Sequence, residues 1–238
     1  MRLRQVEGAG FKHLVIDRVG LSAGNRLHVY IEGDGIPWHG NLPNLDPTPI
    51  NTLALRLSNL DTADIAYVGR PCYFGEHSAN ACNYRYWTSH RYGEAVVHSM
   101  AEVIERIRQP RHHEIVLIGH SGGGTLATLL ESRVAGVVGV VTIAANLDVD
   151  AWTKVHRYDP LTGSLNPIEE PRVPSIPHWQ FVGGKDSRVP LASSRNYSRV
   201  QPNVDLIVFE KFGHVCCWER EWPDILADVA GRLDSKPR

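Results

Sequence analysis

The sequence predicts an α/β protein with a doubly wound, mostly parallel sheet of about seven to eight strands and helices on both faces. The first reason is that short stretches rich in β-branched residues alternate with helical patterns along the chain. The second is that residues 114–118 and 137–143 are nearly continuous apolar runs, as expected of parallel strands covered on both faces. The composition, with 42% hydrophobic and 21% charged residues, is ordinary for a soluble globular domain.

Each element has its own local signal. Apolar residues at spacings of three and four give residues 91–108 one apolar helical face, which Pro110 ends. The regular alternation favours one domain over residues 1–238, with a short lid or loop insertion in the proline-rich stretch at about 148–177. The strands are expected at 13–19, 26–31, 64–68, 114–118, 137–143, 178–182 and 204–209, and the other helices at 52–60, 125–134 and 221–233.

Charge and hydropathy exclude several classes of partner. The net charge is −1 with both signs mixed along the chain, so no nucleic acid and no anionic membrane surface is expected as a partner. No apolar run reaches about 18 residues, so no membrane span is expected. Residues 1–7 lead into no apolar stretch and predict no signal peptide in this chain. A chain trimmed of a leader would look the same, so the compartment stays open between cytoplasmic and exported.

Four cysteines allow three disulfide connectivities, and the sequence does not choose among them. Cys72 and Cys82 are close enough in sequence to staple one loop, which would suit an oxidising compartment. Four reduced thiols are an equally favoured alternative to that disulfide. The adjacent Cys216 and Cys217 are interpreted as packing residues in preference to a vicinal disulfide. No C-x-x-C or His-rich spacing indicates a metal, so no metal site is expected.

The strongest motif is Gly119-His120-Ser121-Gly122-Gly123, placed between the strand at 114–118 and a helical pattern. This is a G-x-S-x-G pentapeptide in the strand–turn–helix context that a nucleophilic serine requires. The residues two before and two after the serine must be small to avoid collision between strand and helix. The N–H of Gly122 stands at the helix N-terminus, where unpaired donors favour an oxyanion. The alternative is a Gly-rich turn that binds phosphate or only connects the two elements.

A serine nucleophile needs a base, and the base needs an orienting carboxylate. Asp186 lies in a Gly-rich turn just past the strand at 178–182, and His214 lies just past the strand at 204–209. Each alone is a weak signal, but the two occur together at equivalent places. We therefore predict Ser121, Asp186 and His214 as a catalytic triad, with Asp148 and Asp150 as less favoured acids.

The turn after the strand at 26–31 is the candidate second half of the oxyanion hole. Glu32-Gly33-Asp34-Gly35 follows that strand, and the N–H of Asp34 is the best candidate donor. A carboxylate close to a developing oxyanion would oppose it, so the Asp34 side chain should point away and brace a neighbouring loop. Arg70 could pair with Glu32 or Asp34. A plain β-turn rich in Gly and Asp is the alternative.

The serine, acid and histidine, in that chain order and with the surrounding strands, resemble the α/β-hydrolase superfamily across nearly the whole chain. Many esterases of that superfamily carry His-Gly-x-Gly where this chain has Glu32-Gly33-Asp34-Gly35, so the glycines match and Glu32 departs. More narrowly, the chain resembles a group of poorly characterised bacterial α/β hydrolases that often carry a lipoprotein or export leader. The segments that carry this second resemblance are YIEGDG at 30–35, GRPC at 69–72, YWT at 86–88, NLD at 146–148, SLNP at 164–167 and GHVCCW at 213–218.

The expected function is hydrolysis of a carboxylic ester with a short to medium acyl chain, through an acyl-enzyme on Ser121. The expected partner is a small-molecule ester, and no cofactor is needed. The alternatives are a thioesterase or acyltransferase of the same fold, and a non-catalytic binding module that keeps the fold without the chemistry. The departure at Glu32 keeps the binding module open.

Overall fold

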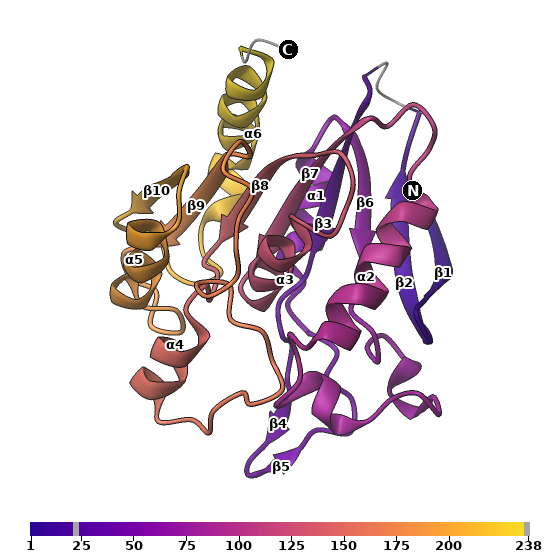
Figure 1. Ribbon diagram of the computed structural model, residues 1–238, viewed down its shortest axis with the longest axis vertical. Coiled ribbons are helices and arrows are strands. Elements are labelled where there is room, and N and C mark those ends of the chain that lie inside the picture. Colours follow the sequence, from indigo (N-terminus) through magenta and orange to yellow (C-terminus); the bar gives the residue numbers. More distant parts are fainter. Residues whose placement is uncertain (21–23, 236–238) are drawn as a thin grey trace.

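The computed structural model describes residues 1–20 and 24–235. Its main feature is one eight-stranded sheet with the order β1-β2-β6-β3-β7-β8-β9-β10 (Figure 1). The six strands from β6 to β10 in this order are parallel, and β1 and β2 join one edge antiparallel. The strands are β1 Arg2–Gly8, β2 Phe11–Arg18, β3 Arg26–Ile31, β6 Asp64–Val68, β7 Glu114–His120, β8 Val137–Ile143, β9 His178–Gly183 and β10 Val204–Phe209.

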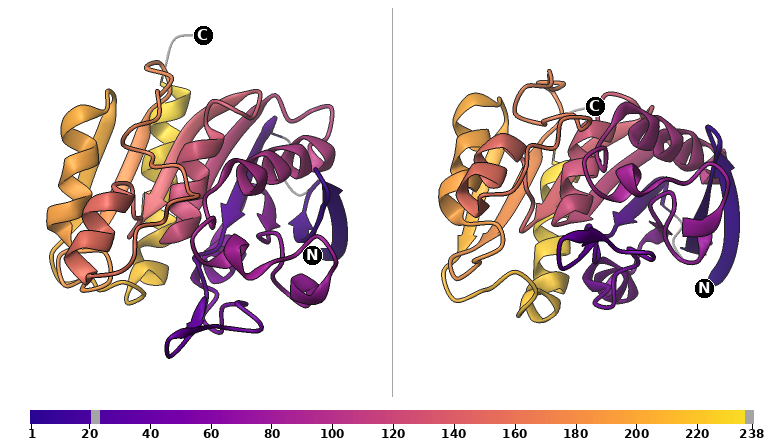
Figure 2. Two further views of the ribbon diagram at one scale, coloured as in Figure 1. Left: turned by 60° about the horizontal axis from the view of Figure 1, so that its bottom comes forward. Right: turned by 90° about the horizontal axis from the view of Figure 1, so that it is seen from below.

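Helices cover both faces of this sheet, which confirms the predicted fold class. Helices α2 and α3 pack on one face and helices α1 and α6 on the other, so that three layers are visible from below (Figure 2). Tyr197 of α5 contacts His178, whose side chain points away from the face that Trp179 covers, so α5 lies on the α2 side. The helices are α1 Leu53–Leu60, α2 Glu94–Ile107, α3 Gly122–Leu130, α4 Val149–His156, α5 Leu191–Val200 and α6 Trp218–Asp234.

The two faces of the sheet bury two separate apolar cores. Under α2 and α3, valine, isoleucine and leucine side chains of the strands meet the apolar face of α2 that the sequence predicts. Under α1 and α6, the core is more aromatic and contains Trp179, Trp218 and Trp222, each at most 1% exposed. Large apolar side chains buried at this level each stabilise the fold by about 1.5–3 kcal/mol. Because strands in the middle are buried on both faces, they read as continuous apolar runs.

Several elements lie outside the sequence expectations. Strand β1 was not expected, because it is a half-exposed edge strand of mixed polar and apolar residues that pairs only with β2. The short hairpin of β4 Trp38–His39 and β5 Leu42–Pro43 and the helix α5 were also not expected. Helix α3 begins at Gly122, three residues before its predicted start, since three glycines hide its periodicity. Within the proline-rich stretch at 148–177, residues Val149–His156 form α4.

All four cysteines are paired, as Cys72–Cys82 and Cys216–Cys217. The first pair closes a loop after β6, as one of the sequence alternatives predicted. The second pair is the vicinal disulfide, so interpreting these two cysteines as packing residues alone was wrong.

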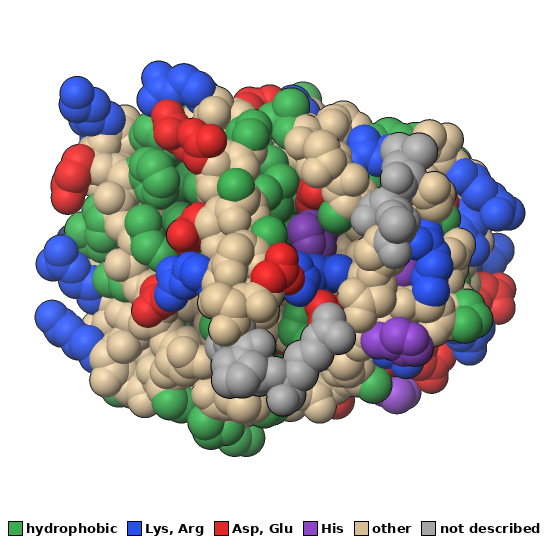
Figure 3. Space-filling view, turned by 90° about the horizontal axis from the view of Figure 1, so that it is seen from above, with side chains coloured by type: hydrophobic (Ala, Val, Ile, Leu, Met, Phe, Trp, Pro, Cys, Tyr) green, Lys and Arg blue, Asp and Glu red, His purple; other side chains and the backbone are tan. Residues whose placement is uncertain are grey.

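Two further expectations concerned membrane spans and the distribution of surface charge. No helix among the described residues is both long enough and apolar enough to cross a membrane. On the face at the amino ends of the parallel strands, basic and acidic side chains are interspersed (Figure 3). That face shows no stripe of a single sign.

Candidate active site

Ser121 lies in the sharp turn between β7 and α3, at the carboxyl end of the central parallel strands (Figure 1). Its φ and ψ are 54° and −126°, a conformation that is sparsely populated by residues with a side chain. Such strain persists only where surrounding structure enforces it. Here the Ser121 N–H donates to the Ile143 carbonyl, and the Ser121 carbonyl accepts from the N–H groups of Gly124 and Thr125. Within the described residues, the Ser121 hydroxyl has no hydrogen-bond partner.

The glycines around Ser121 are small for the reason that the motif predicts. A Cβ on Gly119 would lie 2.2 Å from the Gly123 carbonyl oxygen, and a Cβ on Gly123 would lie 2.2 Å from the Ile31 carbonyl oxygen. Both are backbone collisions, which no side-chain rotation can relieve. The chain can therefore make this turn only with glycine at both positions.

Asp186 and His214 lie against each other although they come from different loops. The His214 Nδ1 donates to the Asp186 Oδ2 over 2.8 Å. The other oxygen of Asp186 accepts the N–H groups of Arg188 and Val189, at 2.8 and 2.9 Å, in the turn after β9. A carboxylate held in this way fixes the orientation of the imidazole and leaves its Nε2 as the acceptor.

The electrostatic environment of His214 favours a neutral imidazole. Burial is the largest cause and lowers the pKa of His214. The hydrogen bond that His214 donates to Asp186 raises this pKa and the nearby charge of His120 lowers it again, so that the net pKa lies below the ordinary value. A neutral histidine is the form that can accept a proton from a serine hydroxyl. The competing acids lie elsewhere: Asp148 caps α4 by accepting the Ala151 N–H.

The turn after β3 lies beside Ser121, as predicted. A Cβ on Gly33 would lie 3.2 Å from the Ser121 Cβ. The Gly33 N–H donates to the Glu32 carboxylate, whereas within the described residues neither the Asp34 N–H nor the Gly122 N–H has an acceptor. These two backbone donors are therefore free to bind a ligand atom.

The Asp34 side chain is held by a buried cluster of cations and tyrosines. Its Oδ1 accepts from Arg70, and its Oδ2 accepts from Arg91 at 3.1 Å and from the Tyr92 hydroxyl at 2.6 Å. Burial raises the pKa of Asp34, but the charges of Arg91 and Arg70 and these hydrogen bonds outweigh it and lower the pKa to about 2. The Arg70 side chain is 1% exposed and that of Arg91 is 5% exposed. The expected contact between Arg70 and Asp34 is therefore present.

Asp34 also approaches the nucleophile turn directly. A Cβ on Gly122 would lie 2.0 Å from the Asp34 Oδ1 and 2.7 Å from the Tyr92 hydroxyl. The Tyr73 hydroxyl donates to the Asp34 carbonyl at 2.9 Å. The contribution of Arg91 and Tyr92 was not recognised in the sequence, where they read as the start of an apolar helix face. The one signal in the sequence was the Asp in a Gly-rich turn, because a buried carboxylate needs cationic partners.

Glu32, which replaces the histidine of the usual esterase motif, is fully used by the fold. Glu32 is 1% exposed, and its carboxylate accepts hydrogen bonds from the backbone N–H groups of Gly33, Ala54 and Leu55 at 3.2, 3.3 and 3.5 Å. Two of these donors belong to the first turn of α1, where unpaired N–H groups and the helix dipole favour a carboxylate. The departure from the motif therefore has a structural explanation.

Helix α4 contacts the loop that carries Asp186. The indole N–H of Trp152 and the Nε2 of His156 both donate to the Arg188 carbonyl, at 2.7 and 2.9 Å. Trp152 also packs edge-on against Tyr158. The beginning of the 148–177 stretch is thereby tied to the acid loop, next to the candidate site.

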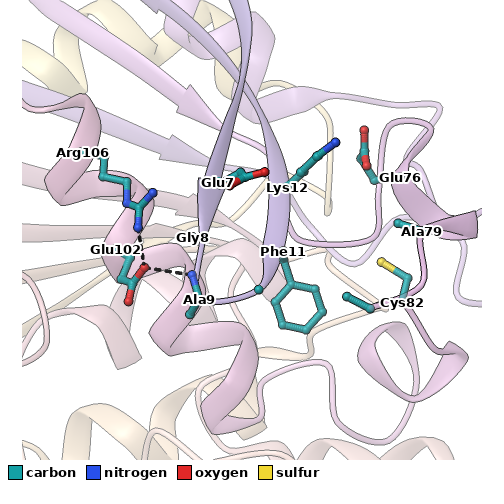
Figure 4. A pocket seen from close by; sticks show the side chains of 12 residues that line it. Glu7, Gly8, Ala9, Phe11, Lys12, Glu76, Ala79, Cys82, Glu102 and Arg106 are labelled. Atoms are coloured by element: carbon teal, nitrogen blue, oxygen red, sulfur yellow. Dashed lines mark hydrogen bonds and ion pairs between the residues drawn. The ribbon is translucent and has the colours of Figure 1, made fainter.

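A pocket of about 360 Å³ lies at a different place, between the β1–β2 turn and α2 (Figure 4). Glu102 accepts the Ala9 N–H and an Arg106 hydrogen bond at its rim. Phe11 and Cys82 form part of its floor. It contains no nucleophile beside a base, so we place the candidate active site at Ser121 on chemical grounds. Among the described residues no group of three or more His, Cys, Asp and Glu side chains could hold a metal ion.

Neither a scan against protein-family models nor a search of curated proteins finds a match to this chain. Solved structures do match. Mouse alpha/beta hydrolase domain-containing protein 10 has a TM-score of 0.68 at 13% identity, covering 98% of this chain and 99% of the other. An esterase from Pyrococcus furiosus has 0.65 at 14% identity, covering 98% and 90%. An alpha-beta serine hydrolase homologue from Coxiella burnetii has 0.61 at 15% identity, covering 98% and 97%.

These similarities extend over almost the whole of this chain and at least 90% of each of the three neighbours. The protein therefore has the α/β-hydrolase fold.

Proposed function

We propose that this protein is a serine hydrolase that cleaves carboxylic esters through an acyl-enzyme. In this proposal Ser121 is the nucleophile, His214 is the general base and Asp186 orients the imidazole. The backbone N–H groups of Gly122 and Asp34 form the oxyanion hole.

The observation that carries the proposal is the 2.8 Å hydrogen bond between His214 and Asp186, formed at the same end of the sheet as the strained Ser121 turn. Two carboxyl-end loops from β9 and β10 and the β7–α3 turn thereby supply an acid, a base and a nucleophile. The esterase from Pyrococcus furiosus among the structural neighbours agrees with this choice.

The chemistry follows from these roles. The Ser121 oxygen attacks the ester carbonyl carbon as its proton passes to the His214 Nε2, and the carbonyl oxygen becomes an oxyanion that accepts from the two free N–H groups. The C–O bond to the alcohol then breaks, and the imidazolium returns its proton to the leaving alcohol. Water attacks the acyl-enzyme with the same base, and the acid and free Ser121 are released.

We propose a short to medium acyl chain as the substrate class, with residues 148–177 acting as a short lid within one domain. The support is the contact of α4 with the loop that carries Asp186, through the Arg188 carbonyl. A thioester substrate or transfer to an acceptor alcohol would use the same groups, and direct assays separate these reactions.

The experiment is hydrolysis of p-nitrophenyl esters from acetate to palmitate by the wild-type chain and by Ser121→Ala. We expect activity that peaks at short or medium chains and falls in the variant by about 10⁴-fold to 10⁶-fold in kcat. Equal activity in both proteins would contradict the assignment of Ser121.

A fluorophosphonate probe separates the enzyme from the binding module. An activated serine reacts covalently with the probe, so labelling of the wild-type chain but not of Ser121→Ala supports the proposal. A folded wild-type chain that neither hydrolyses esters nor takes up the probe would support the non-catalytic alternative instead.

We further propose that the protein works in an oxidising compartment. The support is the pairing of all four cysteines in two disulfides, a pattern that persists where thiols are not kept reduced. Alkylation of the denatured protein, isolated without reductant from its natural host, should add no label. Four labelled thiols would contradict this proposal.

A further inference from the structure

His120, the residue before the candidate nucleophile, connects three parts of the site. Its ring is buried at the end of β7, with 6% of the side chain exposed. Its Nε2 lies 3.0 Å from the His214 carbonyl oxygen, and its Nδ1 lies 3.5 Å from the Glu32 Oε1. The ring centroids of His120 and His214 are 4.9 Å apart.

The contact with His214 defines which ring nitrogen of His120 must carry a hydrogen. A carbonyl oxygen can only accept, so the Nε2 must donate to His214. With that tautomer, a neutral ring would turn the lone pair of Nδ1 towards the Glu32 carboxylate. A ring protonated at both nitrogens turns an N–H towards it instead.

The Glu32 carboxylate is itself immobilised by three backbone N–H groups, one from Gly33 in the turn after β3 and two from the first turn of α1. His120 is therefore braced on one side by an anchored anion and bonds the base loop on the other. Among the described residues, its bond to His214 is the one hydrogen bond that joins residues 213–217 to β3 or β7. The other hydrogen bonds of residues 213–217 run within the loop, to Trp218 and Arg220 of α6, and from His214 to Asp186 in the loop after β9.

We propose that Glu32 and His120 act as a positioning pair, which holds the main chain of His214 in register with Ser121 and supplies a positive charge beside the His214 imidazole. This inference deepens the proposed serine-hydrolase function and rests on it. The pair acts through His214 and touches no substrate.

The two effects have separate consequences. The bond from Nε2 fixes the distance between the nucleophile and its base, because residues 120 and 121 are adjacent. Misplacement of a catalytic group by about 1 Å can cost about 100-fold in rate. The positive charge opposes protonation of His214, which extends the neutral, active base to lower pH.

The charged groups that act on the His214 imidazole come from two elements. Asp186 and Arg188 lie on the loop after β9, and His120 lies on β7 with Glu32 behind it. Asp186 raises the pKa of His214, whereas His120 and Arg188 lower it, after the larger lowering by burial. Removal of the His120 charge alone should therefore raise the pKa of His214.

The test uses three variants with a matched control. His120→Gln keeps an amide donor that can reach the His214 carbonyl but carries no charge, and His120→Phe keeps the ring without any donor. Glu32→Gln keeps acceptors for the backbone N–H groups and removes the anion. His178→Gln is the control, since it removes an equally buried histidine at the amino end of β9, at the opposite end of the sheet from the site.

We expect His120→Phe to lower kcat by about 10-fold to 100-fold with KM changed less than about twofold. His120→Gln should keep most of kcat but move the acidic limb of the kcat/KM profile to higher pH, and Glu32→Gln should keep most of kcat. His178→Gln should leave the acidic limb in place. Wild-type kcat in His120→Phe, or an unmoved acidic limb in His120→Gln, would overturn the proposal.

A second readout does not depend on catalysis. The titration of the His214 imidazole can be followed by NMR in a Ser121→Ala background, with and without His120→Gln. A midpoint that rises on substitution supports the pair even where no ester is turned over. An unchanged midpoint overturns it even where the esterase assay succeeds, so failure of the pair and failure of the proposed function are distinguishable.

Discussion

Asp34→Asn tests the buried cluster behind the candidate oxyanion hole. The substitution keeps the shape of the side chain and its backbone N–H but replaces one carboxylate oxygen by an amide that donates. That amide must face either Arg70 or the pair of Arg91 and Tyr92, which are themselves donors. The change therefore leaves two buried guanidinium groups with one neutral acceptor in place of an anion.

The size of the effect follows from the pKa of Asp34, which is lowered from 3.8 to about 2. A shift of this size corresponds to about 2 kcal/mol in favour of the charged form. Removing one partner of a buried ion pair generally costs about 3–5 kcal/mol, because the remaining charge stays buried. We expect Asp34→Asn to lose about 3 kcal/mol of unfolding free energy at pH 7, out of a typical total of about 5–15 kcal/mol.

The sign of the pH dependence is set by the same shift. A carboxyl group with a lowered pKa in the folded state stabilises the fold above its unfolded value, and this stabilisation is lost as the pH falls from 3.8 through about 2. The difference between wild type and Asp34→Asn should therefore be full at pH 7 and should shrink below pH 3.8.

The assay is urea denaturation followed by tryptophan fluorescence, with Asp46→Asn as the control. Asp46 lies on the same connection after β3, but 46% of its side chain is exposed, so its substitution should change the unfolding free energy by less than about 0.5 kcal/mol. A loss for Asp34→Asn no larger than that of the control would refute the reasoning. A variant that is destabilised as expected should also hydrolyse esters more slowly, since Asp34 bears the proposed donor.

Two further predictions concern other parts of the molecule. Gly123→Ala should lower the unfolding free energy by about 3 kcal/mol or more, or prevent folding, because its Cβ would lie 2.2 Å from a β3 carbonyl oxygen. Gly231→Ala, on the open surface of α6, should raise the unfolding free energy by about 0.5–1 kcal/mol, and thermal melts of both variants check this pair. Burial lowers the pKa of His13 from 6.5 to about 4, so its contribution to stability is present above pH 6.5 and is lost as the pH falls towards 4, by about 2 kcal/mol between pH 8 and pH 5. Urea melts at both pH values should show a smaller loss in His13→Gln than in wild type, and an equal loss would contradict this assignment.

Most of the sheet was predictable because its signals are local. The runs at 137–143 and 204–209 are β-strands with those bounds in the structure, and six of the eight sheet strands are parallel, as the predicted mostly parallel sheet requires. The edge strand β1 and the helix α5 were not predicted. Their sequences are too mixed in polarity, and their structure depends on what lies beside them.

The candidate site divides in the same way. Glycine at 119 and 123, the serine between them and the carboxyl-end positions of Asp186 and His214 could all be recognised from the residues beside them. The partners of Asp34 could not, because Arg91 and Tyr92 are 57 and 58 residues away in sequence. The bond between His120 and His214 spans 94 residues.

The sequence by itself determined the fold class, the strand–turn–helix at Ser121 and the chain positions of an acid and a base. These depend on periodicity and on steric limits within a few residues. The tertiary structure alone decided that the His214 imidazole meets the Asp186 carboxylate, that two arginines pair with Asp34, and that Glu32 lies beside His120. Such contacts join loops from separate strands, so they depend on the order of strands in the sheet, which no local pattern contains.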